Sequence, residues 1–478
     1  ESTKARFLAG NQIGDIARQL YDPRSKGAVI NPKEEGYKEA FSRTQDLLQK
    51  GQPIFEAGFK AQGVMVFADV LIPAKKGGER VWKMVEVKSS TSVKDYHRDD
   101  LAVQSHIASQ CGVPLSKVSV AHIDSSWIYQ GDGDYNGLLC EVDLSNEVIS
   151  RTDEVEEWIN ESHKIVAKRK EPKISTGRHC KDPNPCGFMA YCRSQEPQTE
   201  FPIEWLPGRK LAKLQAHIDK YAVTDLTDVP DALLTDEQRL VKTVSISKKP
   251  FFDKASAKAA LAKYKLPAYF MDFETINFAI PIWKGTHPYQ QIPFQFSVHR
   301  LSNAGKLAHS DFVDLSGKDP SKRFAESLIE ACGLRGPIYV YNAAFEKTRI
   351  SELAGRYPRL KSKLLALNER VVDLYPIARK FYYHPSQQGS WSIKAVLPAI
   401  CPDLSYANLD GVQDGGMAMN AFLEAISPET CKTRLKQIEK QLTEYCKLDT
   451  FAMVRMWSVF SGNPSAVDSV RFDHILVK

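Results

Sequence analysis

Charged residues placed inside apolar, strand-like runs are the feature of this 478-residue sequence that most restricts how it can fold. Asp272 and Glu274 lie two positions apart in one such run, and Glu86 and Lys88 have the same spacing in another. Residues two apart in a strand project from the same face of the sheet. Two like charges buried side by side are costly unless a cation lies between them. The sequence therefore predicts buried strands that carry charge in order to bind metal.

The first charged strand belongs to a β-rich block over residues 53–88. A Lys-Lys-Gly-Gly-Glu break at 75–79 predicts a hairpin turn, which brings Asp69 on the preceding strand beside Glu86. Carboxylate oxygens are the ligands that Mg²⁺ or Mn²⁺ prefers. Lys88 would orient an attacking water or stabilise developing charge. Taken without these neighbours, a Glu-x-Lys pair is typical of an exposed edge strand.

This pattern resembles the PD-(D/E)XK nuclease superfamily, particularly its RecB-like branch, where an Asp is followed by Glu-x-Lys and then by a helix carrying a Gln. The resemblance implies Mg²⁺ or Mn²⁺ held by Asp69 and Glu86, with Lys88 and Gln104 as catalytic residues. Glu56 is a further upstream acid that fits such a site.

A second set of acids occupies the C-terminal half of the chain. Tyr445 and Asp449 are four apart and therefore share one face of a helix. Glu346 follows a buried strand candidate at 337–341, near the start of a helix. Asp373 is either a substitute ligand or a structural acid at a strand end, and the structural role is favoured.

The second set resembles the DEDD exonucleases of the DnaQ-like, ribonuclease-H-like superfamily. Asp272 and Glu274 match the Asp-x-Glu of its first motif. The second motif, Asn-x-x-Phe-Asp, ends here at Glu346, so Glu stands where Asp is usual. The third motif is matched by Tyr445 and Asp449. The resemblance implies that the four acids hold two Mg²⁺ or Mn²⁺ ions and that Tyr445 orients the attacking water.

Three cysteines, Cys180, Cys186 and Cys192, recur at even intervals of six in a Pro- and Gly-containing loop. The spacing differs from that of common zinc fingers. It resembles the C-terminal cysteine triplet of iron–sulfur members of the RecB-like branch, which implies a [4Fe–4S] cluster. Such a cluster needs four thiolates, and we expect the fourth to lie upstream of Glu1. Zinc held by His179 and the three thiols is the alternative. Weaker candidates for the fourth thiolate are Cys111 and Cys140.

Composition limits the class of protein without choosing a function. A hydrophobic content of 43% and a charged content of 26% are ordinary for a globular protein. The formal charge of +6 permits nucleic-acid binding but does not require it. No apolar run has the length of a membrane span, so we expect no membrane association. Nine cysteines are too few for a disulfide scaffold in so long a chain, and we expect a cytoplasmic protein.

These observations predict an α/β chain of three parts. Residues 1–195 are expected to form a PD-(D/E)XK, restriction-endonuclease-like domain with the cysteine cluster. Residues 196–262 are expected to form a small helical connector, and residues 263–478 a ribonuclease-H-like DEDD exonuclease domain.

The predicted function is that of a metal-dependent nuclease that hydrolyses phosphodiester bonds of DNA, at single strands or ends, with two active sites. The sequence leaves two alternatives open. One is an exonuclease directed at RNA. The other is a nucleic-acid-binding protein in which one nuclease site is degenerate. The sequence does not identify protein partners.

Overall fold

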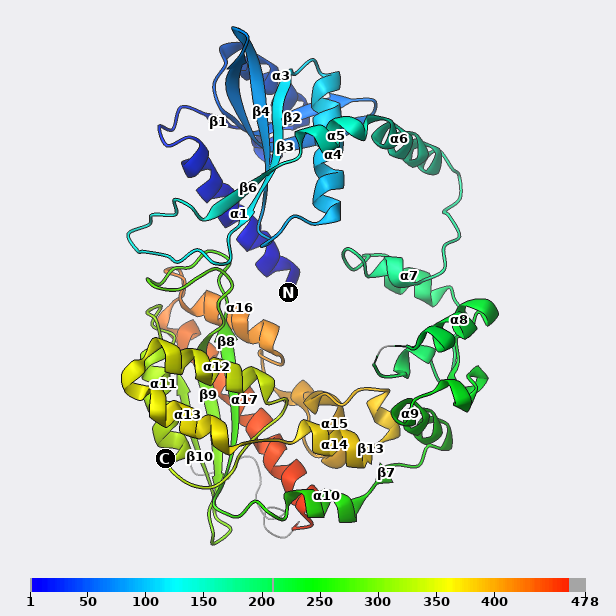
Figure 1. The fold of residues 1–478 in the computed structure, drawn as a ribbon, viewed down its shortest axis with the longest axis vertical. Helices are drawn as coiled ribbons and strands as arrows, with labels where there is room; N and C mark the ends of the chain where they lie inside the picture. Colours follow the sequence, from blue (N-terminus) through cyan, green and yellow to red (C-terminus); the bar gives the residue numbers. More distant parts are fainter. Residues whose placement is uncertain (1, 209, 464–478) are drawn as a thin grey trace. The chain divides into compact units, whose positions relative to one another are not determined.

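The computed structural model describes the backbone of residues 2–208 and 210–463, and side chains from residue 9 onward (Figure 1). The described chain is mixed α/β, as predicted. None of the helices in these described residues has the length and apolar character that crossing a membrane requires.

The chain divides into two compact units. The first unit contains Ser2–Pro197 together with a separate segment, Asn277–Gln290. The second contains Gln198–Ile276 and the described residues from Gln291 onward. The predicted connector thus groups with the C-terminal block, and a segment from inside that block groups with the N-terminal one.

The first unit is built on a six-stranded sheet in the order β1-β2-β3-β4-β5-β6. Strands β4 and β5 run parallel because α4 crosses between them, whereas β3 and β4 form an antiparallel hairpin. Gly77 and Gly78 both have positive φ, as the predicted tight turn requires. The elements of this unit are α1 (Ser2–Tyr21), β1 (Ala28–Val29), α2 (Pro32–Glu35), α3 (Tyr37–Lys50), β2 (Ile54–Ala61), β3 (Val64–Lys76), β4 (Glu79–Lys88), α4 (Asp95–Gln110), β5 (Leu115–Ile123), β6 (Leu139–Asp143), α5 (Ser145–Ser150), α6 (Thr152–Val166) and α7 (Met189–Ser194).

Two hydrophobic clusters cover the two faces of this sheet. Met84 of β4 belongs to a cluster shared with α3 and α4, whereas Val85 and Val87 belong to a cluster shared with α1. The alternation follows from the two-residue period of a strand. Asp69 in the middle of β3 and Glu86 near the end of β4 therefore lie in a sheet that is covered on both faces, whereas the hairpin ends of both strands are exposed.

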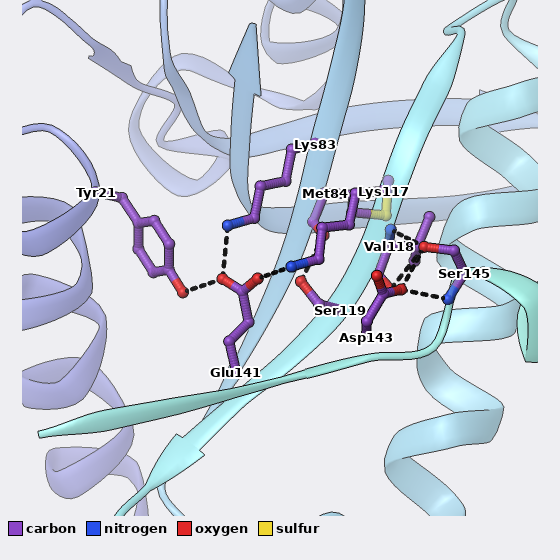
Figure 2. Close-up of polar contacts among 9 residues, drawn as sticks. All are labelled: Tyr21, Lys83, Met84, Lys117, Val118, Ser119, Glu141, Asp143 and Ser145. Atoms are coloured by element: carbon purple, nitrogen blue, oxygen red, sulfur yellow. Dashed lines mark hydrogen bonds and ion pairs between the residues drawn. The ribbon is translucent and has the colours of Figure 1, made fainter. Parts of the chain in front are cut away.

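A carboxylate on β6 ties α1 to the sheet (Figure 2). Glu141 accepts hydrogen bonds from the Tyr21 hydroxyl at the end of α1, at 2.9 Å, and from the ammonium groups of Lys83 and Lys117, each at 2.6 Å. Burial raises the pKa of Glu141, but these three donors outweigh it and leave the pKa below its usual value. The charge of Glu141 is thus satisfied by protein groups, and its role is to hold α1, β4, β5 and β6 together.

The second unit contains a five-stranded sheet in the order β10-β9-β8-β11-β12. The first three strands are antiparallel to one another, and β11 runs parallel to both of its neighbours. Its principal elements are α8 (Ala212–Tyr221), α9 (Asp236–Ser247), β7 (Phe251–Phe252), α10 (Lys254–Leu261), β8 (Ala268–Ile276), β9 (Ile292–Leu301), β10 (Leu307–Val313), α11 (Ser321–Cys332), β11 (Ile338–Val340), α12 (Ala344–Arg356), α13 (Lys361–Arg370), β12 (Val371–Asp373), α14 (Tyr375–Phe381), β13 (Tyr382–Tyr383), α15 (Ile393–Ile400), α16 (Gly415–Ala425) and α17 (Lys432–Ser461).

Strand β8 is buried on both faces. Met271 and Phe273 pack in a cluster with α11, α12 and α13. Phe270 projects to the opposite face, where its ring meets that of Trp457 on α17 at a centroid distance of 5.9 Å. Because Asp272 and Glu274 alternate with the first pair, they project towards α17.

Candidate metal centres

Three acids converge in the second unit. Asp272 and Glu274 on β8 and Asp449 on α17 each offer a carboxylate oxygen, and these oxygens lie within 4.8 Å of one another. Among the described residues, this is the one set of three or more His, Cys, Asp or Glu side chains that meets this spacing. Oxygens at that spacing can bind one divalent cation together. We call these three residues the acidic triad.

Glu346 lies near the triad but outside this spacing. It is on the first turn of α12, is 3% exposed, and has a carboxylate oxygen, Oε2, with no hydrogen-bond partner. Its charge contributes to raising the pKa of Asp272, although burial and the charges of Asp449 and Glu274 contribute more. A buried carboxylate oxygen without a donor is costly, and a bound cation would satisfy it.

Asp373 has the structural role that the sequence favoured. Its carboxylate accepts the backbone N–H groups of Asn342 at 2.9 Å, Ala343 at 3.0 Å and Tyr375 at 2.9 Å. These bonds hold the turn that precedes α12, in which Asn342 has a φ of 74°. Asp373 therefore stabilises the turn that leads into α12, the helix that carries Glu346, and does not belong to the acidic triad.

Three side chains complete the polar surroundings of the triad. A hydrogen bond from the Tyr445 hydroxyl lowers the pKa of Glu274 and of Asp449 and so stabilises their charged forms. The Tyr406 hydroxyl donates to Asp449 Oδ1 at 2.5 Å. Lys394 lowers the pKa of the same two acids through its charge. Sequence reasoning missed the roles of Tyr406 and Lys394, because nothing in the local pattern predicts that the turn at Tyr406 and the first turn of α15 lie beside these acids.

Burial shifts all four acids towards their protonated forms. It raises the pKa of Asp272 well above its usual value, those of Glu274 and Glu346 to about 8 and that of Asp449 to about 6. Repulsion from Asp449 adds to the shift of Asp272 and Glu274. Perturbed carboxyl groups of this kind concentrate at functional sites.

These shifts predict how stability depends on pH. A group whose pKa is higher in the folded than in the unfolded state stabilises the fold at low pH. This contribution is lost as the pH rises through the folded-state pKa, which is about 6 for Asp449 and about 8 for Glu274. Bound Mn²⁺ offsets that loss, because metal displaces protons. We expect Mn²⁺ to raise the Tm more at pH ~8.5 than at pH ~6.5. Each kcal/mol by which Mn²⁺ binding stabilises the fold should raise the Tm by roughly 2–4 °C.

Thermal unfolding in Mn²⁺ or EDTA at the two pH values measures this difference. The Glu274→Gln variant is the control: it removes one titrating ligand and should lose the part of the Mn²⁺ gain at the higher pH that the acidic triad contributes. Equal Mn²⁺ gains at both pH values would contradict the prediction.

The first unit brings together the residues of the other predicted site. The hairpin register pairs Val70 with Val85, which sets Asp69 beside Glu86 as predicted. Asp69 Oδ2 accepts the backbone N–H of Val87 at 2.7 Å, and the Lys88 ammonium donates to Glu86 Oε1 at 2.7 Å. Burial raises the pKa of Glu86 well above its usual value. Asp69, Glu86 and Lys88 form the hairpin site.

Gln104 reaches the hairpin site through a residue that sequence reasoning missed. Its amide Nε2 donates to Asp100 Oδ1 at 3.2 Å, and Asp100 Oδ2 accepts from the Lys88 ammonium at 2.6 Å. The amide oxygen of Gln104 is buried without a partner. Asp100 precedes Gln104 by one helical turn, so the spacing on α4 was the available signal.

Glu56 adds a fourth acid next to the hairpin site. It interrupts β2 between Phe55, which pairs with Val70, and Ala57, which pairs with Ala68, and its φ is 59°. A non-glycine residue in this left-handed region is uncommon and marks functional sites more often than ordinary strands. Burial, with the charge of Glu56 next in effect, raises the pKa of Asp69 to about 7.

A cavity of about 480 Å³ opens onto these acids. Glu56, Asp69, Glu86 and Lys88 line one side, and α1 lines the other, with Arg18 in its wall. The charge of Arg18 lowers the pKa of Glu56, so the guanidinium acts on the same space. The hairpin site is therefore a recessed acidic pocket with cationic groups of both β4 and α1 at its edge.

The cysteine triplet lies in a short irregular loop. Cys186 donates its backbone N–H to the Cys180 carbonyl at 2.8 Å, and Cys192 is on α7. Cys180 is buried, Cys186 is exposed, and all three thiols are free. In the described residues the three sulfurs do not gather within 4.8 Å, whereas a zinc tetrahedron brings sulfurs to about 3.8 Å. Cys111, a weaker candidate, contacts the Lys60 carbonyl through its thiol at 3.5 Å.

Comparison with known proteins adds a domain match and two relatives. Residues 269–392 match a domain of unknown function, DUF2779. This stretch includes Asp272, Glu274 and Glu346 and ends before Asp449. The uncharacterized protein MG366 of Mycoplasma genitalium is 27% identical over 212 residues, which cover 40% of this chain and 32% of that protein. Its homolog in Mycoplasma pneumoniae is 26% identical over 216 residues, 41% of this chain and 32% of that protein.

The matched segment thus spans about a third of the length of these curated relatives. The descriptions of the domain and of the two relatives name no activity.

Proposed function

We propose that this chain is a metal-dependent nuclease that hydrolyses phosphodiester bonds of DNA at two separate active sites. The observation that carries the proposal is the acidic triad: three carboxylates, two of them on buried residues, offer oxygens within 4.8 Å of one another. The charge of a fourth acid, Glu346, acts on Asp272, and one buried oxygen of Glu346 lacks a donor. Such a set is stable as a charged site only with divalent cations present. Bound Mg²⁺ or Mn²⁺ would polarise the scissile phosphate and lower the pKa of an attacking water.

The residues around the triad fit distinct tasks. Burial raises the pKa of Tyr445 above its usual value, so its hydroxyl keeps its proton and can hold a water in line with the phosphate. Tyr406 fixes the Asp449 carboxylate through its hydrogen bond. Lys394 contributes positive charge beside Glu274 and can offset negative charge that develops on the substrate.

Sheet topology supports a ribonuclease-H-like assignment for the second unit. The three antiparallel strands β10, β9 and β8 are followed by β11 and β12 in parallel, with two triad acids on the central strand β8. The long helix α17 packs against that strand and supplies Asp449. This arrangement of acids is what the DEDD resemblance leads one to expect.

The first unit supports a PD-(D/E)XK assignment. An antiparallel hairpin carries Asp69, Glu86 and Lys88, and α4 then crosses to the parallel strand β5. Asp69 and Glu86 would hold Mg²⁺ or Mn²⁺. Lys88 already lies within 2.7 Å of Glu86, which allows it to steady a water next to the metal ligands.

We further propose that Cys180, Cys186 and Cys192 hold a [4Fe–4S] cluster, for which zinc is the alternative. The support is the triplet itself and its position at the end of the first unit. Iron and acid-labile sulfide in anaerobically purified protein would support the cluster, and stoichiometric zinc without iron would overturn it.

The test of the nuclease proposal is a digestion time course with end-labelled single- and double-stranded DNA and RNA. We expect shortening of DNA in Mg²⁺ or Mn²⁺, none in EDTA, and none with the double variant Lys88→Met/Asp272→Asn. Preferential shortening of RNA would redirect the proposal to an RNA exonuclease. Binding without shortening in either metal, or equal digestion by the double variant, would overturn it.

A further inference from the structure

Strand β9 carries a row of polar side chains in the interior of the second unit. Gln295, Ser297 and His299 are each at most 1% exposed, and their spacing of two places them on one face of the strand. Ser297 lies directly opposite Asp272 in the register with β8, and Gln295 lies opposite Glu274. We call these three residues the polar row. It shares a face with the two triad acids of β8 and projects with them towards α17.

Hydrogen bonds join the polar row to α17 at two levels of the helix. The side-chain amide of Gln295 donates to the Leu442 carbonyl at 2.7 Å. About two turns further along the helix, the hydroxyl of Thr450 lies 2.7 Å from Ser297 Oγ and 2.8 Å from His299 Nδ1. Thr450 is fully buried. The side chains of β9 therefore hold α17 at two points along its length.

His309 on β10 extends this network on the other side of Ser297. Its Nε2 lies 2.8 Å from Ser297 Oγ, so the two histidine rings and the two hydroxyls form one unbroken chain of hydrogen bonds. Burial lowers the pKa of His309 to about 4 and that of His299 well below its usual value, so both rings are neutral near neutral pH. The network thus links β10, β9 and α17 without adding charge beside the triad.

These hydrogen bonds supply an orientation that apolar packing does not. Most of the buried residues of α17 are apolar, and hydrophobic burial is not directional. One residue corresponds to about 100° of rotation about a helix axis, so a shift of α17 by one position would turn Asp449 away from β8. Hydrogen bonds require a defined direction between their partners. Because Thr450 follows Asp449 directly, its bond to Ser297 fixes the rotation of the helix at the triad.

We propose that Ser297 and Thr450 are positioning residues of the acidic triad: the hydrogen bond between their hydroxyls sets the rotation of α17 and so places the Asp449 carboxylate within the triad. The inference rests on the proposed function of the triad as a metal site. Neither hydroxyl belongs to the triad itself. Side chains that orient a metal ligand from outside its coordination shell change metal affinity by about 10- to 100-fold when they are removed.

Titration with Mn²⁺, followed by the electron paramagnetic resonance signal of the free ion, tests this role without relying on activity. The full chain carries Asp69→Asn and Glu86→Gln, which remove the two predicted metal ligands of the hairpin site. In this background we expect Thr450→Val, which keeps the shape of the side chain but lacks its hydroxyl, to lower Mn²⁺ affinity by about 10-fold or more. Thr450→Ser keeps the hydroxyl and should stay within about 2-fold of the background protein.

Ser297→Ala removes the same hydrogen bond from its other end, and it carries the test alone if Thr450→Val does not fold. Because the two residues share one bond, the double variant should bind Mn²⁺ about as weakly as Thr450→Val does. Ser458→Ala is the matched control. Ser458 is also fully buried on α17, but its hydroxyl donates within the helix, to the Arg455 carbonyl at 2.8 Å. It should leave Mn²⁺ affinity within about 2-fold.

Three results would overturn the positioning role: unchanged Mn²⁺ affinity in Thr450→Val or Ser297→Ala, an equal loss in Thr450→Ser or Ser458→Ala, or fully independent losses in the double variant. If the affinities follow the expected pattern but the background protein digests no DNA, the positioning role stands and the triad is not a nuclease site. Digestion of DNA by the background protein, with the same Mn²⁺ affinity in Thr450→Val, would reject the positioning role and leave the nuclease proposal standing.

Discussion

Replacing Asp272 with Asn is expected to reduce nuclease activity of the second unit by on the order of 10³-fold, measured in a Lys88→Met background that silences the hairpin site. Asp272 shares a cation position with Glu274 and Asp449, and its pKa is raised by burial and by both of their charges. The Asn amide has the shape of the carboxylate, but its oxygen is a weaker metal ligand and it lacks the negative charge. Metal affinity and rate should therefore fall together.

The control for this variant is Asp311→Asn. Asp311 is also a partly buried acid of the second unit whose pKa burial raises, but it lies on β10 and outside the triad. We expect its activity to stay within about 2-fold of the parent, because surface substitutions away from a site have small effects. Comparable losses in both variants would indicate general destabilisation and would count against the triad as the active site.

Replacing Lys88 with Met is expected to reduce activity of the first unit by roughly 10²- to 10³-fold in an Asp272→Asn background. The ammonium of Lys88 bridges Glu86 and Asp100, and its pKa is raised because these charges outweigh burial, the largest single effect on the group. Methionine keeps most of the apolar stem but leaves the two carboxylates without their shared donor. Initial rates of digestion of labelled DNA measure the loss.

Lys83→Met is the matched variant for this experiment. Lys83 lies on the same strand and also donates to a carboxylate, that of Glu141 at 2.6 Å, but it does not line the cavity at the hairpin site (Figure 2). It should retain activity within about 2-fold. If Lys88→Met digests DNA as fast as Lys83→Met does, Lys88 has no catalytic role and the first centre is structural.

Much of both centres follows from short-range patterns. The pairing of Asp69 with Glu86 depends on a hairpin whose two glycines are visible in the sequence, and the structure has the pair in that register. Asp272 and Glu274 share a face because strands have a period of two. Tyr445 and Asp449 share a face because four residues make about one helical turn.

Other parts of the centres depend on contacts between segments that are distant in the chain. Tyr406 reaches Asp449 from a loop 43 positions earlier in the chain. Asp100 was overlooked although it lies one turn from Gln104, because its role depends on how α4 crosses the sheet to meet Lys88. The turn before α12, the helix that carries Glu346, is held by Asp373 from another strand.

The sequence by itself determined which acids share a face, where the hairpin turns and that the chain is mixed α/β, because the periods of strands and helices are local properties of the backbone. Only the tertiary structure decided which helix covers which acid and that Asn277–Gln290 packs beside β4 although it is inserted between β8 and β9. Those pairings depend on which apolar faces bury one another. Because hydrophobic burial is not directional, the sequence of one segment does not specify which distant segment packs against it.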